Sequence, residues 1–435
     1  MTMTLAEKII ARAAGEARVR PGDIVTCRVD LAMMHDSGGP RRIKPMLERI
    51  GAEVWDLSKV VIITDHFVHE RDADSVAIQK TTREWVAAQG LANFHDKEGI
   101  CHIVLPERGY LRPGMFVVGG DSHSTTGGAY GCLMIGIGST EMAGVLATGE
   151  IWVRVPPTVL VRAEGRLGAG VAAKDIMLML CRRIGISGAN YKAVEYAGPA
   201  VEAMPMSERM VLTNMAAELG AKAGIIAPDA VTADALAEAG VAPGTDEWRG
   251  DAGGAPGTDG WRGDPDAAYE RTIAFDAGEL APQVAAPHSP ENSAPVDAHA
   301  GTPVDQAYIG ACTGAKLEDL RMAALILHGR KTAVPLFVAP ASVRTAEAAA
   351  GDGTMAALEE AGARILPSGC GACIGLGPAA LGADKVGIAT TSRNFKGRMG
   401  AVTSATYLAS PYTVAATAIA GRIADPREFL ADATP

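Results

Sequence analysis

The sequence lacks any long hydrophobic run. No stretch reaches the length of about 18 apolar residues that predicts a membrane-spanning helix, so we expect no membrane domain. Residues 1–15 have a helical composition that ends on Gly15, without the apolar centre of a signal peptide. The cysteine count is seven, an odd number, and this favours a reducing compartment. We therefore expect a cytoplasmic protein.

The sequence also lacks the marks of several common function classes. A net charge of −10 disfavours a nucleic-acid partner bound through phosphate contacts. No Walker sequence occurs, and the single G-x-G-x-x-A pattern at 375–380 has no acidic partner on a following strand. No G-x-S-x-G is present, and catalytic triads come from separated segments, so the Asp-Ser-His run at 121–123 does not indicate a serine hydrolase.

Short apolar runs rich in β-branched residues alternate with Ala- and Leu-rich helical patterns along the 435 residues. Four of these runs lie at 60–64, 115–119, 158–162 and 333–339. Each is followed within a few residues by Gly, Ser or Asp and then by a helix-like stretch. This alternation predicts an α/β fold whose polar loops lie at the C-terminal ends of the strands.

Two segments interrupt the alternation. The ten residues at 242–251 are nearly repeated at 255–264, which predicts an exposed insertion in a surface loop. We expect no binding role for its tryptophans, Trp248 and Trp261. The stretch at 281–303 is rich in Ala, Pro and Ser and indicates an interdomain connection.

Three cysteines lie in loops rich in Gly, Ser and Thr. Cys312 is one, and Cys370 and Cys373 form a C-x-x-C pair. Three thiolates are one fewer than the four that close a structural zinc site or an iron–sulfur cluster, so they predict a metal group with an open position. Such a group suits Lewis-acid catalysis. A C-x-x-C alone also occurs as a redox pair, as half a zinc site or as two buried thiols. The other cysteines are predicted core residues: Cys27, Cys101, Cys132 and Cys181.

Histidines stand beside carboxylates in two loops. Asp65 and His66 follow the apolar run at 60–64, and the loop at 119–128 carries Asp-Ser-His among four glycines. A further histidine, His102, ends the sequence Gly-Ile-Cys-His. An aspartate beside an imidazole fixes its tautomer and raises its basicity, so these pairs predict general acid–base chemistry. For either pair alone, a capping aspartate beside a surface histidine is the alternative.

A basic loop follows the apolar run at 386–389. Its two arginines, Arg393 and Arg398, provide planar forks suited to carboxylates, and Ser392 can complete the contacts. The loop predicts a dicarboxylate substrate. A solvated surface patch is the alternative for this loop taken alone.

Together these residues resemble the aconitase superfamily, and within it the large subunits of 3-isopropylmalate dehydratases and their homoaconitase-like relatives. The similarity runs over nearly the whole chain apart from the repeat insertion. It is carried by Thr64-Asp-His66, Gly99-Ile-Cys-His102, Gly120-Asp-Ser-His123, Gly136-Ile-Gly-Ser-Thr-Glu141, Thr213-Asn-Met-Ala-Ala-Glu218, Cys312, Cys370-x-x-Cys373 and Arg393-Asn-Phe-x-Gly-Arg398. The resemblance implies three α/β domains, each with a largely parallel sheet flanked by helices, at 1–157, 158–280 and 281–435.

The resemblance also implies a cofactor and a set of roles. Cys312, Cys370 and Cys373 would bind a [4Fe–4S] cluster with one iron open to the substrate. His66 would protonate the departing hydroxyl. The acid–base group would comprise Asp65, His66, His102, Asp121, His123 and Glu218. The substrate contacts would comprise His35, Ser122, Asn214, Ser392, Arg393 and Arg398.

In this family the catalytic base is a serine on a mobile swivel domain. The sequence shows no further α/β block after the arginine loop, so we expect the swivel domain to be absent from this chain. We expect a separate small subunit to carry that domain and its serine, forming a heterodimer with this chain.

Four positions depart from the family pattern. Gly314 and Ala315 replace an Asn-Ser pair, Ser392 replaces Asn, and Thr126 stands where Asn or a ring-bearing residue is usual. These departures leave the reaction class in place, with 3-isopropylmalate/2-isopropylmalate isomerisation in leucine biosynthesis as the first reading. Other acids stay open as substrates, namely the diacids 2-methylmalate, 2,3-dimethylmalate and maleate and the triacids homocitrate and citrate. A non-catalytic binding protein of this fold and a zinc-dependent or cluster-free lyase also stay open.

Overall fold

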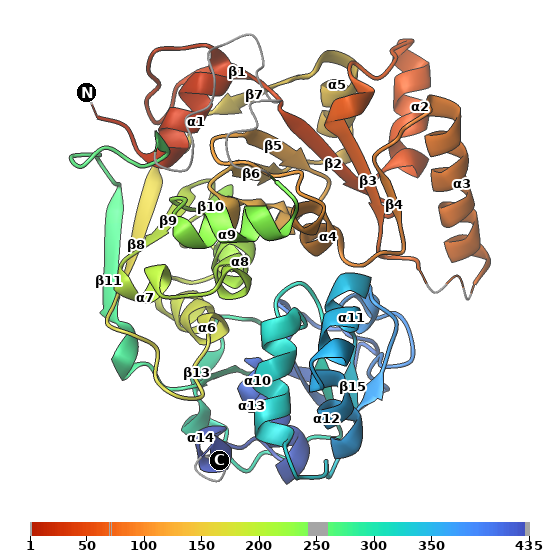
Figure 1. The fold of residues 1–435 in the computed structure, drawn as a ribbon, viewed down its shortest axis with the longest axis vertical. Helices are drawn as coiled ribbons and strands as arrows, with labels where there is room; N and C mark the ends of the chain where they lie inside the picture. The colour runs from red at the N-terminus through yellow and green to blue at the C-terminus, as the bar shows by residue number, and fades with distance from the viewer. Residues whose placement is uncertain (1, 69, 71, 242–259, 431–435) are drawn as a thin grey trace. The chain divides into compact units, whose positions relative to one another are not determined.

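The chain forms two compact units, each with its own sheets. The computed structural model describes residues 2–68, 70, 72–241 and 260–430. The first unit comprises 1–97, 101–163 and 189–274, and the second comprises 98–100, 164–188 and 275–435. Figure 1 labels their helices and strands along the chain.

A five-stranded parallel sheet is the centre of the first unit. Its order is β4-β3-β2-β5-β6, and every neighbouring pair is parallel. Its strands are β2 (Leu31–His35), β3 (Val60–Thr64), β4 (Phe94–Asp96), β5 (Phe116–Gly119) and β6 (Leu133–Gly136). The strands β2 and β3 are fully buried apolar runs, as central parallel strands are. Their C-terminal ends therefore lie at one edge of the sheet.

Helices accompany this sheet, and α2 and α3 pack against each other (Figure 1). Their bounds are α1 (Leu5–Ala14), α2 (Pro40–Ile50), α3 (Ala73–Gln89), α4 (Cys101–Glu107) and α5 (Ser139–Thr148). Local sequence signals determine both ends of the first helix, α1. Thr4 and Glu7 form a capping box at its start, and Gly15 adopts φ 69° at its end. The predicted glycine-terminated helix at the N-terminus is confirmed.

A smaller sheet and a ribbon complete the first unit. The sheet has the order β10-β9-β8-β11, in which β8, β9 and β10 are parallel. The ribbon pairs β1 antiparallel with β7. The strands are β1 (Ile24–Arg28), β7 (Glu150–Arg154), β8 (Thr158–Glu164), β9 (Ala193–Ala197), β10 (Ala223–Ile226) and β11 (Arg271–Asp276). The accompanying helices are α7 (Pro199–Glu202), α8 (Met206–Asn214) and α9 (Ala230–Glu238).

The second unit is built on a seven-stranded sheet of order β13-β12-β18-β17-β14-β15-β16. The strands from β18 to β16 are parallel, and β12 runs antiparallel to both of its neighbours. The strands are β12 (Gln283–Ala285), β13 (Ser293–Pro295), β14 (Gln306–Ile309), β15 (Leu336–Val338), β16 (Arg364–Ile365), β17 (Val386–Ala389) and β18 (Ala405–Ala409). The helices are α6 (Ala173–Ile184), α10 (Leu317–Leu327), α11 (Val343–Gly351), α12 (Thr354–Ala361), α13 (Pro411–Ala420) and α14 (Arg427–Leu430).

The predicted α/β class is confirmed, with largely parallel sheets accompanied by helices. All four apolar runs named from the sequence contain strands: β3, β5, β8 and β15. The last is shorter than its run and begins after Pro335, which has no N–H to give to a ladder. The four cysteines expected in the core have no exposed surface. The three domain ranges stay a prediction.

The segment 281–303 is more than a connection. It forms β12 and β13, and β12 pairs with β18 in the seven-stranded sheet. The prediction of an interdomain connection was therefore wrong. Each of the two strands is only three residues long. Such short strands leave no alternating pattern in the sequence, so composition alone indicated a loop.

Trp261 is also a correction. The repeat was expected to be exposed, but Trp261 retains only 6% of its surface and belongs to the main core of the first unit. The backbone of Gly114 lies directly against its indole, and a Cβ at Gly114 would come within 2.0 Å of Trp261 Cε2. Trp248 and most of the repeat lie outside the described residues.

Across the described part of the chain, no helix combines the length and apolar character needed to cross a bilayer.

Trp261→Ala is expected to lower the free energy of unfolding by about 3–5 kcal/mol, because a large buried ring would leave a cavity. Trp152 is a matched control because it is 66% exposed, and Trp152→Ala should change stability by no more than about 0.5 kcal/mol. Urea denaturation followed by circular dichroism measures both. Equal effects of the two substitutions would contradict the buried position of Trp261.

Candidate active site

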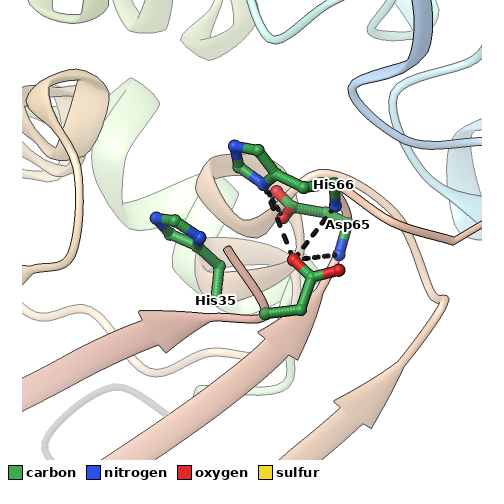
Figure 2. A group of neighbouring side chains, drawn as sticks. His35, Asp65 and His66 are labelled. Atoms are coloured by element: carbon green, nitrogen blue, oxygen red, sulfur yellow. Dashed lines mark hydrogen bonds and ion pairs between the residues drawn. The ribbon is translucent and has the colours of Figure 1, made fainter. Parts of the chain in front are cut away.

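Two neighbouring strands of the first unit end in a group of two histidines and two aspartates. His35 and Asp36 come at the end of β2, and Asp65 and His66 follow β3. One side-chain atom from each of the four lies within 4.8 Å of the others. Figure 2 shows His35, Asp65 and His66 at the ends of their strands. Parallel strands bring their ends to one edge, and this places residues 30 positions apart in contact.

Asp65 fixes His66. The distance from Asp65 Oδ1 to His66 Nδ1 is 2.5 Å, and Asp65 Oδ2 accepts a hydrogen bond of 2.8 Å from the N–H of Cys101. Asp36 supports the same turn. Its carboxylate accepts the backbone N–H groups of His66 and Phe67 at 3.1 and 2.8 Å. The His66 ring is therefore oriented through its Nδ1, and its Nε2 faces away from Asp65.

The charges in this group determine its protonation. Burial lowers the pKa of His66, but Asp65, Asp36 and Asp121 outweigh burial and raise it to about 9. The Asp65 carboxyl keeps a lowered pKa despite burial because of His66. Burial and the neighbouring His66 lower the pKa of His35, whose ring stacks on His66 at 4.4 Å. At neutral pH the group therefore pairs an imidazolium with a neutral imidazole.

A second group lies at the end of β5. Asp121 Oδ1 is 2.9 Å from Nε2 of His102 and accepts the backbone N–H of His123 at 2.8 Å. His123 Nε2 lies 2.8 Å from Oε1 of Glu218. The Asp121 carboxyl is half-buried, and His102 and His123 hold its pKa well below its ordinary value despite the opposing effect of burial. Two histidine–carboxylate pairs, His102 with Asp121 and His123 with Glu218, thus meet at the loop that follows β5.

The remaining predicted residues of the first unit lie around this second group. Asn214 Nδ2 donates a hydrogen bond of 2.7 Å to Oγ1 of Thr126, which in turn donates to the carbonyl of His123 at 2.6 Å. Thr126, one of the departures from the family pattern, therefore connects Asn214 to the histidine loop. Ser122 begins the 3-10 helix Ser122–Tyr130 and is exposed.

The three predicted metal ligands lie in the second unit at the ends of parallel strands. Cys312 follows β14, and Cys370 and Cys373 follow β16. None of the three forms a disulfide within the described residues, and Cys312 and Cys373 are buried. Ala311 adopts φ 67°, a left-handed conformation that is unusual for a residue with a Cβ. This strained turn comes immediately before Cys312.

The donor type of the thiols limits the metal groups that they could hold. Thiolates are soft donors that suit zinc or an iron–sulfur cluster, and three of them leave one position open.

A buried lysine connects the Cys312 loop with the arginine loop. Lys174 Nζ donates to the carbonyls of Thr390 and Thr391 at 2.6 and 2.8 Å, and to Oγ1 of Thr313 at 3.2 Å. Thr313 adjoins Cys312, and Thr391 precedes the arginine loop. Burial lowers the pKa of Lys174 to about 8. Sequence reasoning missed this residue, although a Lys-Asp pair inside the apolar helix α6 was a signal that could have identified it.

Thr390 accounts for one departure from the family pattern. Its Oγ1 accepts from the N–H of Gly310 and donates to the carbonyl of Gly310, both at 2.9 Å. A Cβ at Gly314 would lie 2.1 Å from the Cβ of Thr390. Gly314 is therefore required by packing against Thr390. The structure gives no physical reason for Ala315.

The arginine loop follows β17 and is fixed by Asn394. The side-chain amide of Asn394 donates to the carbonyls of Ala286 and Thr406, both at 2.9 Å. Arg393 and Arg398 are half-buried, and Ser392 is buried. Nε of Arg398 is buried and has no hydrogen-bond partner among the described residues. This N–H is available to an anionic ligand.

The first unit thus provides paired acids and bases, and the second provides three thiols and two arginines. Paired acids and bases suit proton transfer, and thiols and arginines suit a metal group and an anionic ligand. Comparisons with known proteins agree. The family model described as aconitase family (aconitate hydratase) matches residues 7–421, and the chain belongs to this family.

Individual relatives are similar over their full length. The chain is 45% identical to 3-isopropylmalate dehydratase large subunit 1 of Methanopyrus kandleri, covering 99% of this chain and 100% of that protein. It is 44% identical to a probable methanogen homoaconitase large subunit of Methanosarcina mazei, covering 92% and 99%. The fold is similar to a crystal structure of Thermococcus kodakaraensis aconitase X in its holo-form, with a TM-score of 0.51 at 13% identity. That comparison covers 93% of this chain and 97% of the other.

Asp65→Asn is expected to lower the pKa of His66 from about 9 towards its ordinary value, because the largest charge that raises it is removed. A raised histidine pKa stabilises the fold fully below pH 6.5, and this contribution is lost as the pH rises through about 9. The variant should therefore lose stability at neutral pH and show less pH dependence between these values. NMR titration of the His66 ring measures the pKa. Asp56→Asn is the control because Asp56 caps a short helix at 57–59, and an unchanged titration in Asp65→Asn would contradict the assignment.

Proposed function

We propose that this chain is the large subunit of a hydro-lyase that dehydrates and rehydrates a hydroxy-dicarboxylate. Membership of the aconitase family and the names of the relatives support this reaction class. The observation that carries the proposal is the His66 imidazolium, which Asp65 orients and whose pKa lies near 9. A dehydratase needs such a proton donor because hydroxide is a poor leaving group.

His66 is the proposed general acid. It is protonated at neutral pH, and Asp65 binds its Nδ1, so Nε2–H is the proton that reaches the substrate. Asp36 positions the turn through the backbone N–H groups of His66 and Phe67. His35 stacks on the ring and, as a neutral imidazole, can accept a hydrogen bond from a substrate hydroxyl.

The second group, around Asp121 and His123, is proposed to bind the water that leaves in dehydration and is added back in rehydration. His123 and Glu218 form a pair that can exchange one proton, and Asp121 orients His102 and the loop. The amide of Asn214 and the hydroxyl of Ser122 provide further hydrogen bonds to oxygen atoms. These roles need polar groups at fixed positions, and the buried contacts supply that rigidity.

Arg393 and Arg398 are proposed to bind the substrate carboxylates, with Ser392 beside them. A guanidinium binds a carboxylate through two parallel N–H bonds, which fixes its orientation as well as its charge. The available Nε of Arg398 supports this role. Two carboxylate sites also stabilise the negative charge that develops on the substrate when its proton leaves.

Cys312, Cys370 and Cys373 are the proposed ligands of a [4Fe–4S] cluster. Soft thiolate donors of this kind fit such a cluster. When bound, the cluster supplies a Lewis acid for a substrate oxygen. Lys174 holds the Thr313 and Thr391 ends of the two loops in register.

The proposed reaction is balanced by two proton transfers. A base removes the proton on the carbon next to a carboxylate, the electron pair forms the C=C bond, and the C–O bond breaks. The hydroxyl leaves as water with the proton from His66. We assign the base to a serine on the swivel domain of a separate small subunit, and the "large subunit" names of the relatives support such a partner. Rehydration at the neighbouring carbon completes an isomerisation.

The proposed substrate is 3-isopropylmalate, interconverted with 2-isopropylmalate in leucine biosynthesis. The name of the Methanopyrus relative supports this choice, and that of the Methanosarcina relative supports homocitrate as the second candidate. We also propose three aconitase-like domains within the two units and a cytoplasmic location.

The proposal is tested by co-expression with the candidate small subunit, anaerobic reconstitution with iron and sulfide, and absorbance of the unsaturated product. Turnover of 3-isopropylmalate above 2-methylmalate, 2,3-dimethylmalate, maleate, homocitrate and citrate is the expected result. Cys370→Ser should abolish it because one cluster ligand is lost. A brown, reconstituted complex that turns over none of these acids would support the non-catalytic alternative instead.

His66→Gln should lower kcat by roughly 10²–10⁴-fold with little change in KM, because only proton donation is lost. Arg398→Lys should lower kcat/KM by about 10–100-fold, because one point charge replaces a bidentate fork. Arg364→Lys is the control. Arg364, on β16, lies over the ring of Phe337, on β15, so its substitution should leave kcat and KM unchanged. Steady-state kinetics measure all three. A His66→Gln variant with full kcat would contradict the assignment of the acid.

A further inference from the structure

Tyr308 lies between the two cysteine loops of the second unit. It is on β14, four residues before Cys312, and it is 1% exposed. Its ring fills the space beside Gly310, where a Cβ would lie 2.3 Å from the hydroxyl oxygen. On the other side, a Cβ at Gly371, next to Cys370, would lie 3.6 Å from the same oxygen. The hydroxyl therefore reaches the backbone of both loops that carry the thiols.

The hydroxyl of Tyr308 is buried without a partner. It makes no hydrogen bond to any group in the described part of the chain. Leaving a buried hydroxyl unsatisfied costs about 1–3 kcal/mol, so most buried tyrosines have a partner. Lys174, Thr390 and Thr313 form a connected hydrogen-bond network next to Cys312. The Tyr308 hydroxyl takes no part in this network.

The hydroxyl is a donor at neutral pH. A phenol stays protonated well above pH 7, and burial raises the pKa of Tyr308 further. The acceptors that a bound cluster would bring close to this hydroxyl are sulfur atoms. Sulfur atoms of iron–sulfur clusters accept hydrogen bonds, and these bonds are among the features that set cluster potentials.

We propose that Tyr308 Oη donates a hydrogen bond to a sulfur of the bound cluster, either a bridging sulfide or a coordinating thiolate. This inference rests on the proposed cluster. Tyr308 is then a positioning residue that stabilises the cluster in its more negative, reduced state.

Tyr308→Phe is expected to change stability differently in the protein without a cluster and in the protein with a cluster. Without a cluster, Tyr308→Phe removes an unpaired buried hydroxyl, so its stability should be unchanged or raised. With a cluster, the same change removes a hydrogen bond, so its stability should fall. The reduction potential should also fall, because the reduced cluster is a stronger hydrogen-bond acceptor and loses more than the oxidised one.

The test compares wild type and Tyr308→Phe in the full chain, each prepared without metal and after anaerobic reconstitution. Thermal unfolding measures stability in both forms, and a redox titration followed by electron paramagnetic resonance measures the potential. Resonance Raman bands in H₂O and D₂O identify the acceptor, because bridging and terminal Fe–S stretches occur at different frequencies. Tyr407→Phe is the matched control, as Tyr407 is half-buried on β18 with its ring against His299.

The expected result is a lower potential and a cluster-dependent loss of Tm in Tyr308→Phe, with neither in Tyr407→Phe. A loaded variant with the wild-type potential, and with the same change of Tm in both forms, would overturn the inference while leaving the cluster in place. That outcome would assign a buried water as the partner of Tyr308. A wild-type chain that takes up no iron and sulfide would overturn the proposed cofactor and this inference together.

Discussion

The second unit depends on one buried ammonium group. Lys174 donates to the carbonyls of Thr390 and Thr391 and to the hydroxyl of Thr313. A buried cation must be fully hydrogen-bonded, so its partners cannot move independently. The loop that carries Cys312 and the loop that carries the arginines therefore hold a fixed register. The proposed metal ligands and the proposed carboxylate-binding arginines are in this way preorganised within one folded unit.

The first unit uses buried carboxylates for the same purpose. Asp36 binds the backbone of the His66 turn, and Asp65 binds both the imidazole and the N–H of Cys101. The negative charges that orient His66 also raise its pKa, so geometry and protonation have a common origin. A second carboxylate, Asp121, lies 2.9 Å from Nε2 of His102 and accepts the backbone N–H of His123. Acid–base chemistry near neutral pH follows from this arrangement.

The strong local patterns of the sequence were sufficient for the α/β class and for the strands. Apolar runs such as 60–64 became buried parallel strands, and the polar motifs appeared at strand ends. Weak patterns failed. The strands β12 and β13 are three residues each, and Trp261 is buried although it belongs to a Gly- and Pro-rich repeat. Both outcomes depend on partners distant in the chain, which composition does not report.

The sequence by itself determined which chemical groups exist and their order along the chain: three thiols, the Asp-His pairs and two arginines. The spacing of these motifs is a property of the sequence, so it can be read without a structure. Only the tertiary structure decided which groups touch. Lys174 bridges loops 139 and 216 residues away, and Tyr308 lies buried between two cysteine loops without an acceptor. Such contacts arise because parallel strands bring distant segments to one edge, and burial then determines the cost of every polar atom left there.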